Sequence, residues 1–390
     1  MDIRRCFRNM PAMRLVMMVL LTAASISYAL PERFLKAKGN VLQDTAGKTL
    51  QLRGVNLGCW LIMEPWMCPM DSSGLKDEGS ARDLLEKRFG QATADSLFQD
   101  WQESWFDESD LDRIAALGLN AVRLPIWYRN LQTEDGQWLP DGFKRIDWFV
   151  QSAWKRGIYT ILDLHGAPGG QTKGESTGRI RPNAELWNNE AHLARTPSLG
   201  TLWSTYDRLY RAIREIDPDH VISVEGCINT RVGEKSIGWG WDALPHPDLF
   251  GWKNMLYQLH HYEWDWNDLD KQKRGIDFHV SEWNSHTSYG VPVYMGEFNP
   301  MAQEQAWSHA LGKFTESGFS WTFWTYKATH GTGSDSWGLY NPIKKPVAPN
   351  LATDDLETIR TKWRSNGTTD HYALNPMIQK TLSQLPPLSK

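Results

Sequence analysis

The sequence predicts an α/β fold of the (β/α)8-barrel type in which the fourth βα unit is truncated. Short apolar runs alternate with amphipathic helical stretches, and this alternation is typical of parallel βα units. Polar or aromatic residues stand at the end of each apolar run, where a barrel builds its active site. Only seven such runs are present, so one strand of eight is missing.

The seven predicted strands are apolar runs of four to eight residues, the length expected of a buried strand. They lie at 52–56, 120–124, 158–164, 220–225, 254–260, 292–297 and 319–324. Helical apolar spacing predicts helices around 109–117, 143–153, 202–213 and 301–316. Ser109, with Asp112 three residues later, is expected to cap the first of these helices, and Gly118 to end it.

The missing strand should lie between the third and the next apolar run. Helical stretches and the link 196–200 occupy that interval, which contains no β-type run. The simplest explanation is that a block on the order of 30 residues, the size of one βα unit, is absent between Arg195 and Leu199. A natural deletion, a gene-model error and an inactive descendant of an enzyme have the same appearance in the sequence.

The N-terminus has the three-part layout of a secretory signal peptide. Arg4, Arg5 and Arg8 precede the apolar run 15–24, and a small-x-small sequence then ends at Ala29. The alternative, a membrane anchor, is disfavoured because the apolar run is shorter than the ~20 residues of a membrane span. We therefore expect a secreted protein that is cleaved near Ala29 and has no stable membrane span.

The remaining chain is expected to be a monomer, with a barrel over 30–345 and a C-terminal extension over 346–390 that packs on it. The net charge of the chain is -4 and no dense Lys/Arg block is present, which argues against a nucleic-acid partner. Cleavage near Ala29 would remove Cys6 and leave three cysteines, Cys59, Cys68 and Cys227. Because three is an odd number, at least one thiol is unpaired within the chain. The sequence contains no CxxC or His-x3-His motif that would indicate a metal site, and it implies no cofactor.

The 21 tryptophans are unusual. Their broad apolar faces and single N–H donors suit the flat faces and hydroxyl edges of sugars, although most of them are expected to pack in the core or its rim. Those near predicted strand ends and loops are Trp60, Trp66, Trp127, Trp264, Trp266, Trp283 and Trp324.

Six motifs in order resemble those of glycoside hydrolase family 5 (cellulase-like, clan A), near its exo-β-1,3-glucanase branch. They are 52–61 (LRGVNLGCWL), 120–126 (NAVRLPI), 163–171 (DLHGAPGGQ), 260–262 (HHY), 296–297 (GE) and 323–327 (FWTYK). The resemblance implies a TIM-type barrel that cleaves β-1,3- or β-1,4-glucan by a retaining mechanism, with a polysaccharide or oligosaccharide as its partner.

The resemblance also assigns roles to single residues. Glu297 matches the nucleophile, and Arg123 and Tyr262 are expected to keep it ionised. His260 completes the predicted catalytic set. His261 should point to the opposite face of its strand. The predicted substrate-binding residues are His165, Trp324 and Asn56, and Glu64 is a further candidate for the rim of the cleft.

One family feature is absent. Family members carry an Asn-Glu pair at the end of the fourth strand, and its Glu is the general acid/base, but this chain has no fourth strand. Glu190, in a helical stretch, and Glu225, on the following strand, are the two alternatives for that role. A catalytically impaired carbohydrate-binding pseudoenzyme of the same fold is therefore the alternative function.

Overall fold

The computed structural model describes residues 34–187, 202–226, 240–241, 244–329 and 336–388. The expected signal peptide, Glu190, Cys227 and the interval between Arg195 and Leu199 lie outside these residues. The chain divides into two compact units. The first unit comprises 1–54, 190–323 and 384–390, and the second comprises 55–189 and 324–383.

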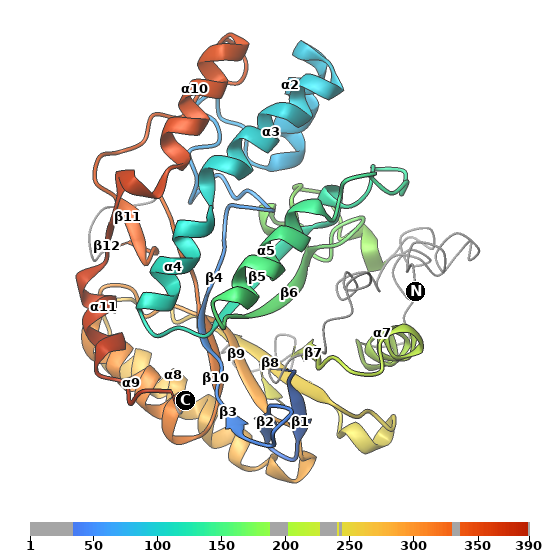
Figure 1. Ribbon diagram of the computed structural model, residues 1–390, viewed down its shortest axis with the longest axis vertical. Helices are drawn as coiled ribbons and strands as arrows, with labels where there is room; N and C mark the ends of the chain where they lie inside the picture. Colours follow the sequence, from blue (N-terminus) through green and yellow to red (C-terminus); the bar gives the residue numbers. More distant parts are fainter. Residues whose placement is uncertain (1–33, 188–201, 227–239, 242–243, 330–335, 389–390) are drawn as a thin grey trace. The chain divides into compact units, whose positions relative to one another are not determined.

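All seven predicted strands are present and are labelled in Figure 1. They are β4 (Arg53–Asn56), β5 (Ala121–Trp127), β6 (Tyr159–Gly166), β7 (Ile222–Glu225), β8 (Met255–His261), β9 (Val293–Phe298) and β10 (Ser320–Phe323). In the first unit the strand order is β10-β9-β8-β7, and every neighbouring pair is parallel. In the second unit the order is β6-β5-β4, with β5 and β6 parallel, and β4 crosses the boundary between the two ranges.

Strands β6 and β7 are edge strands. Between them, the described residues 167–187 and 202–221 contain no strand, and each edge strand has a single neighbour in the sheet. β5, β8 and β9 are buried along their whole length, whereas β6 is only half-buried from Tyr159 to His165. Strands of a parallel sheet are normally buried on both faces, so the partial exposure of β6 sets it apart from β5, β8 and β9.

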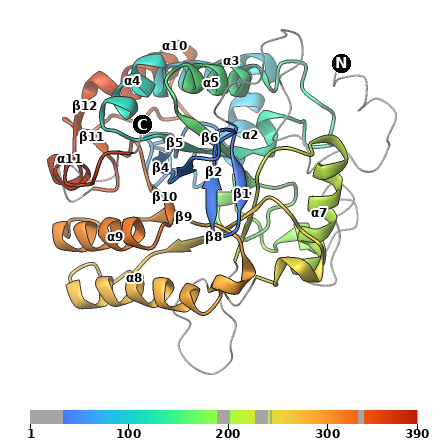
Figure 2. The ribbon, with the colours of Figure 1, turned by 60° about the horizontal axis from the view of Figure 1, so that its bottom comes forward.

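Among the described residues of the first unit, three helices accompany the strands: α7 (Leu202–Ile216), α8 (Leu269–Asn284) and α9 (Glu304–Glu316). α8 and α9 lie side by side in both ribbon views (Figures 1 and 2). Phe314 of α9 is fully buried and packs edge-on against Phe298 of β9, with ring centroids 5.2 Å apart. The apolar side of α9 thus covers the strand that carries Glu297.

The second unit contains α2 (Glu78–Phe89), α3 (Gln91–Trp105), α4 (Glu108–Ala116), α5 (Lys144–Lys155), α10 (Leu356–Gly367) and α11 (Pro376–Ser383). α10, from the predicted C-terminal extension, packs on α3. The rings of Trp363 and Phe98 lie 5.3 Å apart, and the Arg360 guanidinium donates to the Asp100 carboxylate at 2.6 Å. The described 3-10 turns of this unit are η2 (Tyr128–Asn130), η3 (Glu175–Thr177), η4 (Glu185–Trp187) and η9 (Thr369–His371), whereas η6 (Pro247–Leu249) and η7 (Thr287–Tyr289) belong to the first unit.

The predicted cap of α4 was wrong. Asp107, not Ser109, is the N-cap, and its carboxylate accepts from the backbone N–H groups of Ser109 and Asp110. The Asp110 side chain accepts from the Asp107 N–H in return, which completes a capping box. Two acidic side chains near the positive end of the helix satisfy more backbone donors than the single Ser109 hydroxyl would.

Lys327 connects α3 to the end of α10. Its buried ammonium donates to the carbonyl oxygens of Trp105 at 2.5 Å and Gly367 at 2.6 Å, and to the Thr369 hydroxyl at 2.7 Å. The antiparallel pair β11 (Tyr340–Pro342) and β12 (Tyr372–Leu374) is also part of this unit. Both features hold residues 346–383 in the second unit.

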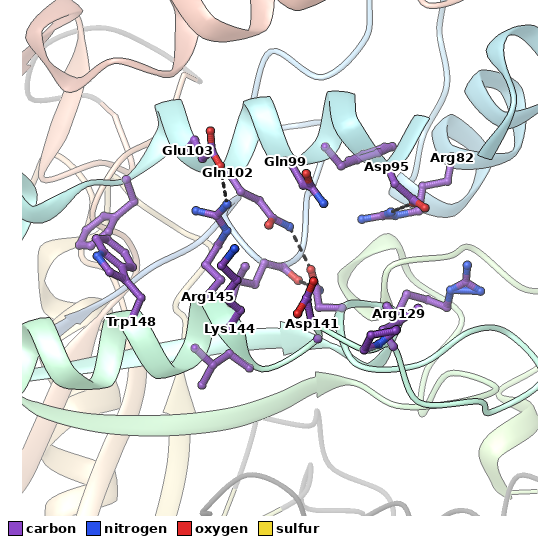
Figure 3. A pocket seen from close by; sticks show the side chains of 18 of the residues that line it. Arg82, Asp95, Gln99, Gln102, Glu103, Arg129, Asp141, Lys144, Arg145 and Trp148 are labelled. Carbon is purple, nitrogen blue, oxygen red and sulfur yellow. Dashed lines mark hydrogen bonds and ion pairs between the residues drawn. The ribbon is translucent and has the colours of Figure 1, made fainter. Parts of the chain in front are cut away.

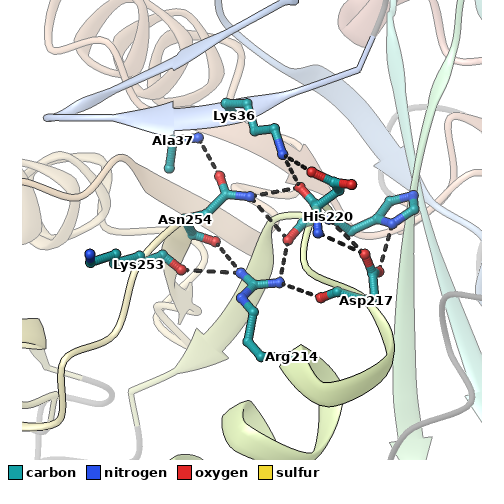
Figure 4. Close-up of polar contacts among 8 residues, drawn as sticks. Lys36, Ala37, Arg214, Asp217, His220, Lys253 and Asn254 are labelled. Atoms are coloured by element: carbon teal, nitrogen blue, oxygen red, sulfur yellow. Dashed lines mark hydrogen bonds and ion pairs between the residues drawn. The ribbon is translucent and has the colours of Figure 1, made fainter. Parts of the chain in front are cut away.

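An antiparallel sheet of β1 (Lys36–Lys38), β2 (Val41–Gln43) and β3 (Thr49–Leu50) precedes β4. Figure 4 shows how β1 is attached near the beginnings of β7 and β8. The Ala37 N–H donates to the Asn254 side chain at 2.7 Å, and the Lys36 ammonium lies 2.7 Å from the Asp219 carboxylate. Polar contacts thus attach β1 to the residues that precede β7 and β8.

Cys59 and Cys68 form no disulfide. Both thiols are buried and donate to the carbonyl oxygen of Glu64, at 3.5 and 3.1 Å respectively. Burial raises the pKa of the Cys59 thiol well above its ordinary value, so this thiol remains protonated and unreactive. Within the described part of the chain, no helix is long and apolar enough to cross a membrane.

Candidate active site

Polar side chains gather at the carboxyl ends of β7, β8 and β9 in the first unit. The strand register pairs Glu225 with Gln258, and His260 with Glu297. Parallel strands end at a common edge, so apolar strand interiors followed by polar ends place these side chains together.

Glu297 is almost fully buried, with 7% of its surface exposed. The Tyr262 hydroxyl donates to Oε2 of Glu297 at 2.8 Å, and Nδ1 of His260 lies 3.5 Å from the same oxygen. A hydroxyl that donates to a carboxylate stabilises its ionised form, which is the form that attacks carbon. The structure therefore brings together three of the predicted catalytic residues, Glu297, His260 and Tyr262.

Glu225 lies on the other side of the same histidine. Its Oε1 is 3.4 Å from Nδ1 of His260, and its Oε2 accepts a 3.0 Å hydrogen bond from the Gln258 amide. The Gln258 amide nitrogen also lies 2.9 Å from Nε2 of His260. With Nε2 accepting from the amide, the imidazole proton is on Nδ1 and faces both carboxylates.

Gln258 was not predicted from the sequence. Side chains of a strand alternate between its two faces, so residue 258 shares a face with residue 260. That alternation was visible in the sequence, but it does not distinguish a buried glutamine that orients a histidine from one that only fills space.

His261 points to the opposite face of β8, as expected. Nε2 of His279 on α8 lies 3.2 Å from Nδ1 of His261, and Gly275 of the same helix leaves room for the ring. Burial, together with the neighbouring His279, lowers the pKa of His261 to about 3. This histidine is a neutral packing residue outside the candidate site.

The second unit holds another group of predicted residues around Arg123. Its guanidinium is buried, donates to the Asn56 side chain at 2.9 Å and forms a 2.8 Å ion pair with Asp163. The same Asp163 oxygen lies 2.8 Å from Nδ1 of His165. Asp163 is therefore a charge partner of Arg123, which was not predicted from the sequence.

The expected contact between Arg123 and Glu297 stays a prediction, because the two residues belong to different compact units. Trp324 is buried and stacks on the imidazole of His165, with centroids 5.8 Å apart and an interplanar angle of 20°. Glu64, the candidate for the rim, is also buried and accepts from the indole N–H of Trp66 at 2.9 Å.

Two tryptophans follow Tyr262 and are open to solvent. The Trp264 ring stacks on Tyr262 with centroids 5.5 Å apart, and 66% of its surface is exposed. Trp266 is also exposed, and its ring centroid lies 6.3 Å from that of Trp264. By contrast, Trp60 and Trp127 are buried. An aromatic surface thus continues outward from the residue that contacts Glu297.

A pocket of about 710 Å³ lies elsewhere, between α3 and the start of α5 in the second unit (Figure 3). Gln102 and Glu103 line it from one side, and Lys144 and Arg145 from the other, with a 3.2 Å contact between Arg145 and Glu103. None of the predicted catalytic or substrate-binding residues lines this pocket. It belongs to the helical layer and not to the strand ends.

Comparison with known proteins agrees with the motif resemblance. Residues 86–188 and 183–330 match the sequence model of the family Cellulase (glycosyl hydrolase family 5) in two pieces. The chain is 34% identical to "Probable glucan 1,3-beta-glucosidase A" of Aspergillus clavatus over 388 positions, covering 78% of this chain and 88% of that protein. It is 26% identical to "Beta-xylosidase" of Phanerodontia chrysosporium over 351 positions, covering 75% and 71%.

The fold is also similar to solved structures. The rutinosidase of Aspergillus niger matches with a TM-score of 0.58 and 16% sequence identity, over 74% of this chain and 95% of that chain. An endogalactoceramidase matches with a TM-score of 0.54 and 17% identity, over 85% and 84%. At these identities the likeness concerns the fold alone, and it confirms the predicted TIM-type barrel class.

Proposed function

The chain belongs to the family Cellulase (glycosyl hydrolase family 5), and on that premise we propose that it hydrolyses β-linked glucans by a retaining mechanism with Glu297 as the nucleophile. The observation that carries the proposal is the environment of Glu297: a buried carboxylate at a strand end, hydrogen-bonded by Tyr262 and facing His260. The relative named as a glucan 1,3-beta-glucosidase supports β-1,3-glucan as the first substrate to test.

In this mechanism, Glu297 attacks the anomeric carbon and forms a covalent glycosyl-enzyme. Water then hydrolyses this ester and the sugar leaves with retained configuration. His165 and Trp324 are proposed to contact the sugar, as the family resemblance implies. The exposed faces of Trp264 and Trp266 offer stacking surfaces of the kind that saccharides use.

We further propose that the truncation of the fourth unit is a property of this sequence. The two matched pieces of the family model meet at residues 183–188, next to the interval where the fourth strand was expected. The alignment with the Aspergillus clavatus protein has 388 positions but includes only 78% of this chain. The relative therefore has residues at many positions where this chain has none.

The pseudoenzyme remains the second candidate function. It is favoured by the absence of an Asn-Glu pair at a fourth strand within the described residues between β6 and β7. The transcript sequence between the codons for Arg195 and Leu199 separates a natural truncation from an omitted exon.

Covalent trapping tests the hydrolase function directly. The full chain is incubated with an activated 2-deoxy-2-fluoro-β-glucoside and digested, and the label is mapped by mass spectrometry. We expect labelling of Glu297, and a loss of more than about a thousandfold in aryl β-glucoside turnover in Glu297→Gln. Glu316→Gln, an exposed glutamate on α9, is the matched control. A chain that binds glucan but is neither labelled nor active is a pseudoenzyme.

Secretion and the monomeric state are part of the same proposal. The arginine-rich N-terminus, apolar run and small-x-small site support cleavage near Ala29. N-terminal sequencing of protein recovered from culture medium tests the cleavage, and light scattering tests the monomer.

A further inference from the structure

We propose that Glu225 performs the general acid/base step that the truncated fourth strand would otherwise supply. The inference rests on the proposed hydrolase function and adds the identity of the second carboxyl group. Glu225 ends β7, whereas the family's acid/base glutamate ends the fourth strand. The proposal therefore assigns the role to a different strand of the barrel.

The spacing of the two carboxylates carries the proposal. Oε1 of Glu225 lies 3.4 Å from Nδ1 of His260, and Oε2 of Glu297 lies 3.5 Å from the same atom. Two oxygens that contact one nitrogen at these distances are separated by at most their sum, roughly 7 Å. Carboxyl groups about 5–5.5 Å apart are typical of retaining glycosidases, and about 6.5–9.5 Å of inverting ones. This limit for the two facing oxygens is compatible with the spacing of a retaining enzyme.

The two carboxylates have different surroundings, as their different roles require. The Glu297 side chain is 9% exposed and the Glu225 side chain is 31% exposed. Glu225 can therefore exchange protons with solvent and with a departing sugar oxygen. Two carboxylates that contact the same imidazole nitrogen disfavour simultaneous ionisation, and the Tyr262 hydroxyl stabilises the charged form of Glu297. The proton that general acid catalysis requires is accordingly assigned to Glu225.

Neighbouring side chains hold Glu225 in place. The Gln258 amide donates to its Oε2 at 3.0 Å, and the Tyr206 hydroxyl donates to its backbone oxygen at 2.7 Å. Ser223 donates to the other end of the Gln258 amide at 3.3 Å, which orients the amide nitrogen toward Glu225 and His260. Side-chain contacts from Gln258 and Tyr206 thus fix the end of β7.

The chemistry balances with these two residues and one water. As a Glu297 oxygen bonds to the anomeric carbon, the bond from that carbon to the leaving oxygen breaks, and Glu225 gives its proton to that oxygen. The ionised Glu225 then takes a proton from water while the water oxygen bonds to the anomeric carbon and releases Glu297. The net reaction is hydrolysis, with Glu225 protonated again at its end.

The test compares wild type, Glu225→Ala, Glu225→Gln and Glu316→Gln on two aryl β-glucosides. Acid assistance matters for a poor leaving group such as methylumbelliferone and little for 2,4-dinitrophenolate. We expect kcat/KM of Glu225→Ala to fall about 10²- to 10⁴-fold on the poor leaving group and far less on the good one. Azide should restore turnover of the good substrate by Glu225→Ala and give the β-glycosyl azide, and Glu316→Gln should behave as wild type.

Glu225→Gln is nearly isosteric and guards against misfolding of the alanine variant. It should keep the melting temperature of wild type and lose the alkaline limb of the pH profile of kcat/KM, because that limb reports the general acid. If Glu297 is labelled but both Glu225 variants hydrolyse the substrate with the poor leaving group as fast as wild type does, the role of Glu225 is overturned and the proposed function stands. Absence of labelling and turnover in the wild type overturns both the assignment and the proposed function.

Discussion

Tyr262 donates a 2.8 Å hydrogen bond to Oε2 of Glu297. Tyr262 follows β8 and Glu297 lies in β9, and the register of these strands pairs His260 with Glu297. His261 is the one residue that lies between His260 and Tyr262 in the sequence. The contact therefore depends on the alignment of two neighbouring parallel strands, which the buried residues of both strands hold in place.

Removing the hydroxyl should slow catalysis. In Tyr262→Phe the ionised Glu297 loses a hydrogen-bond donor while the ring remains, so we expect kcat/KM for an aryl β-glucoside to fall about 10- to 100-fold. Steady-state kinetics measures the change. Tyr372→Phe, which removes a 2.7 Å hydrogen bond to the carbonyl oxygen of Asn366, is the control and should keep wild-type kinetics. Equal effects of the two substitutions would argue against a specific role for Tyr262.

Trp264 should contribute to glucan binding and not to chemistry. Its exposed ring stacks on Tyr262 and presents an apolar face to solvent. We expect Trp264→Ala to raise KM for a soluble β-glucan about three- to tenfold, with kcat on a small aryl glucoside close to wild type. Trp203→Ala, which removes an exposed tryptophan of α7, is the matched control. An unchanged KM for glucan in Trp264→Ala would remove this residue from the binding surface.

Asp163 should matter for stability because it pairs with a buried guanidinium. Arg123 is 1% exposed, and Asp163→Asn would remove the carboxylate that forms a 2.8 Å ion pair with its guanidinium. We expect a loss of about 3 kcal/mol in the free energy of unfolding, measured by urea denaturation. Asp83→Asn, which breaks the exposed pair with Arg179, should cost less than about 1 kcal/mol. Similar losses in both variants would show that the Arg123 charge is compensated otherwise.

The strands could be predicted from the sequence because each is a short apolar run with polar or aromatic residues at or near its end. The same logic predicted that His260 and Glu297 lie together, since parallel strands share an edge. Charge partners could not be predicted in this way. Asp163 and Gln258 alternate correctly with their neighbours, but alternation fixes only the face of a strand and not the group that is met there.

The helices α2 and α3 were not predicted, and α2 shows why. Its buried residues include Glu78, Gly79 and Arg82, and the buried Glu78 carboxylate pairs with Arg82 at 2.7 Å. A helix that buries an ion pair lacks the apolar periodicity by which helices are recognised. The cap of α4 was misplaced for a related reason, because several adjacent polar residues could each have capped the helix.

The network of Figure 4 predicts how stability depends on pH. Burial opposes ionisation of Asp217, but hydrogen bonds from the His220 ring and the backbone N–H groups of His220 and Asp219 prevail and lower its pKa to about 2. The folded pKa lies below the ordinary value of 3.8, so the unfolded chain binds this proton more tightly. The carboxylate therefore contributes stability above about pH 4 that is lost as the pH falls toward 2.

We expect this contribution to be on the order of 2 kcal/mol, and Asp217→Asn should abolish it. Urea unfolding at pH 7 and pH 3 measures it: the variant should be less stable than wild type at pH 7, and the difference should shrink at pH 3. Asp248→Asn, at an exposed aspartate of η6, should leave both values unchanged. A constant difference between wild type and Asp217→Asn at the two pH values would mean that the carboxylate acts by its shape and not by its charge.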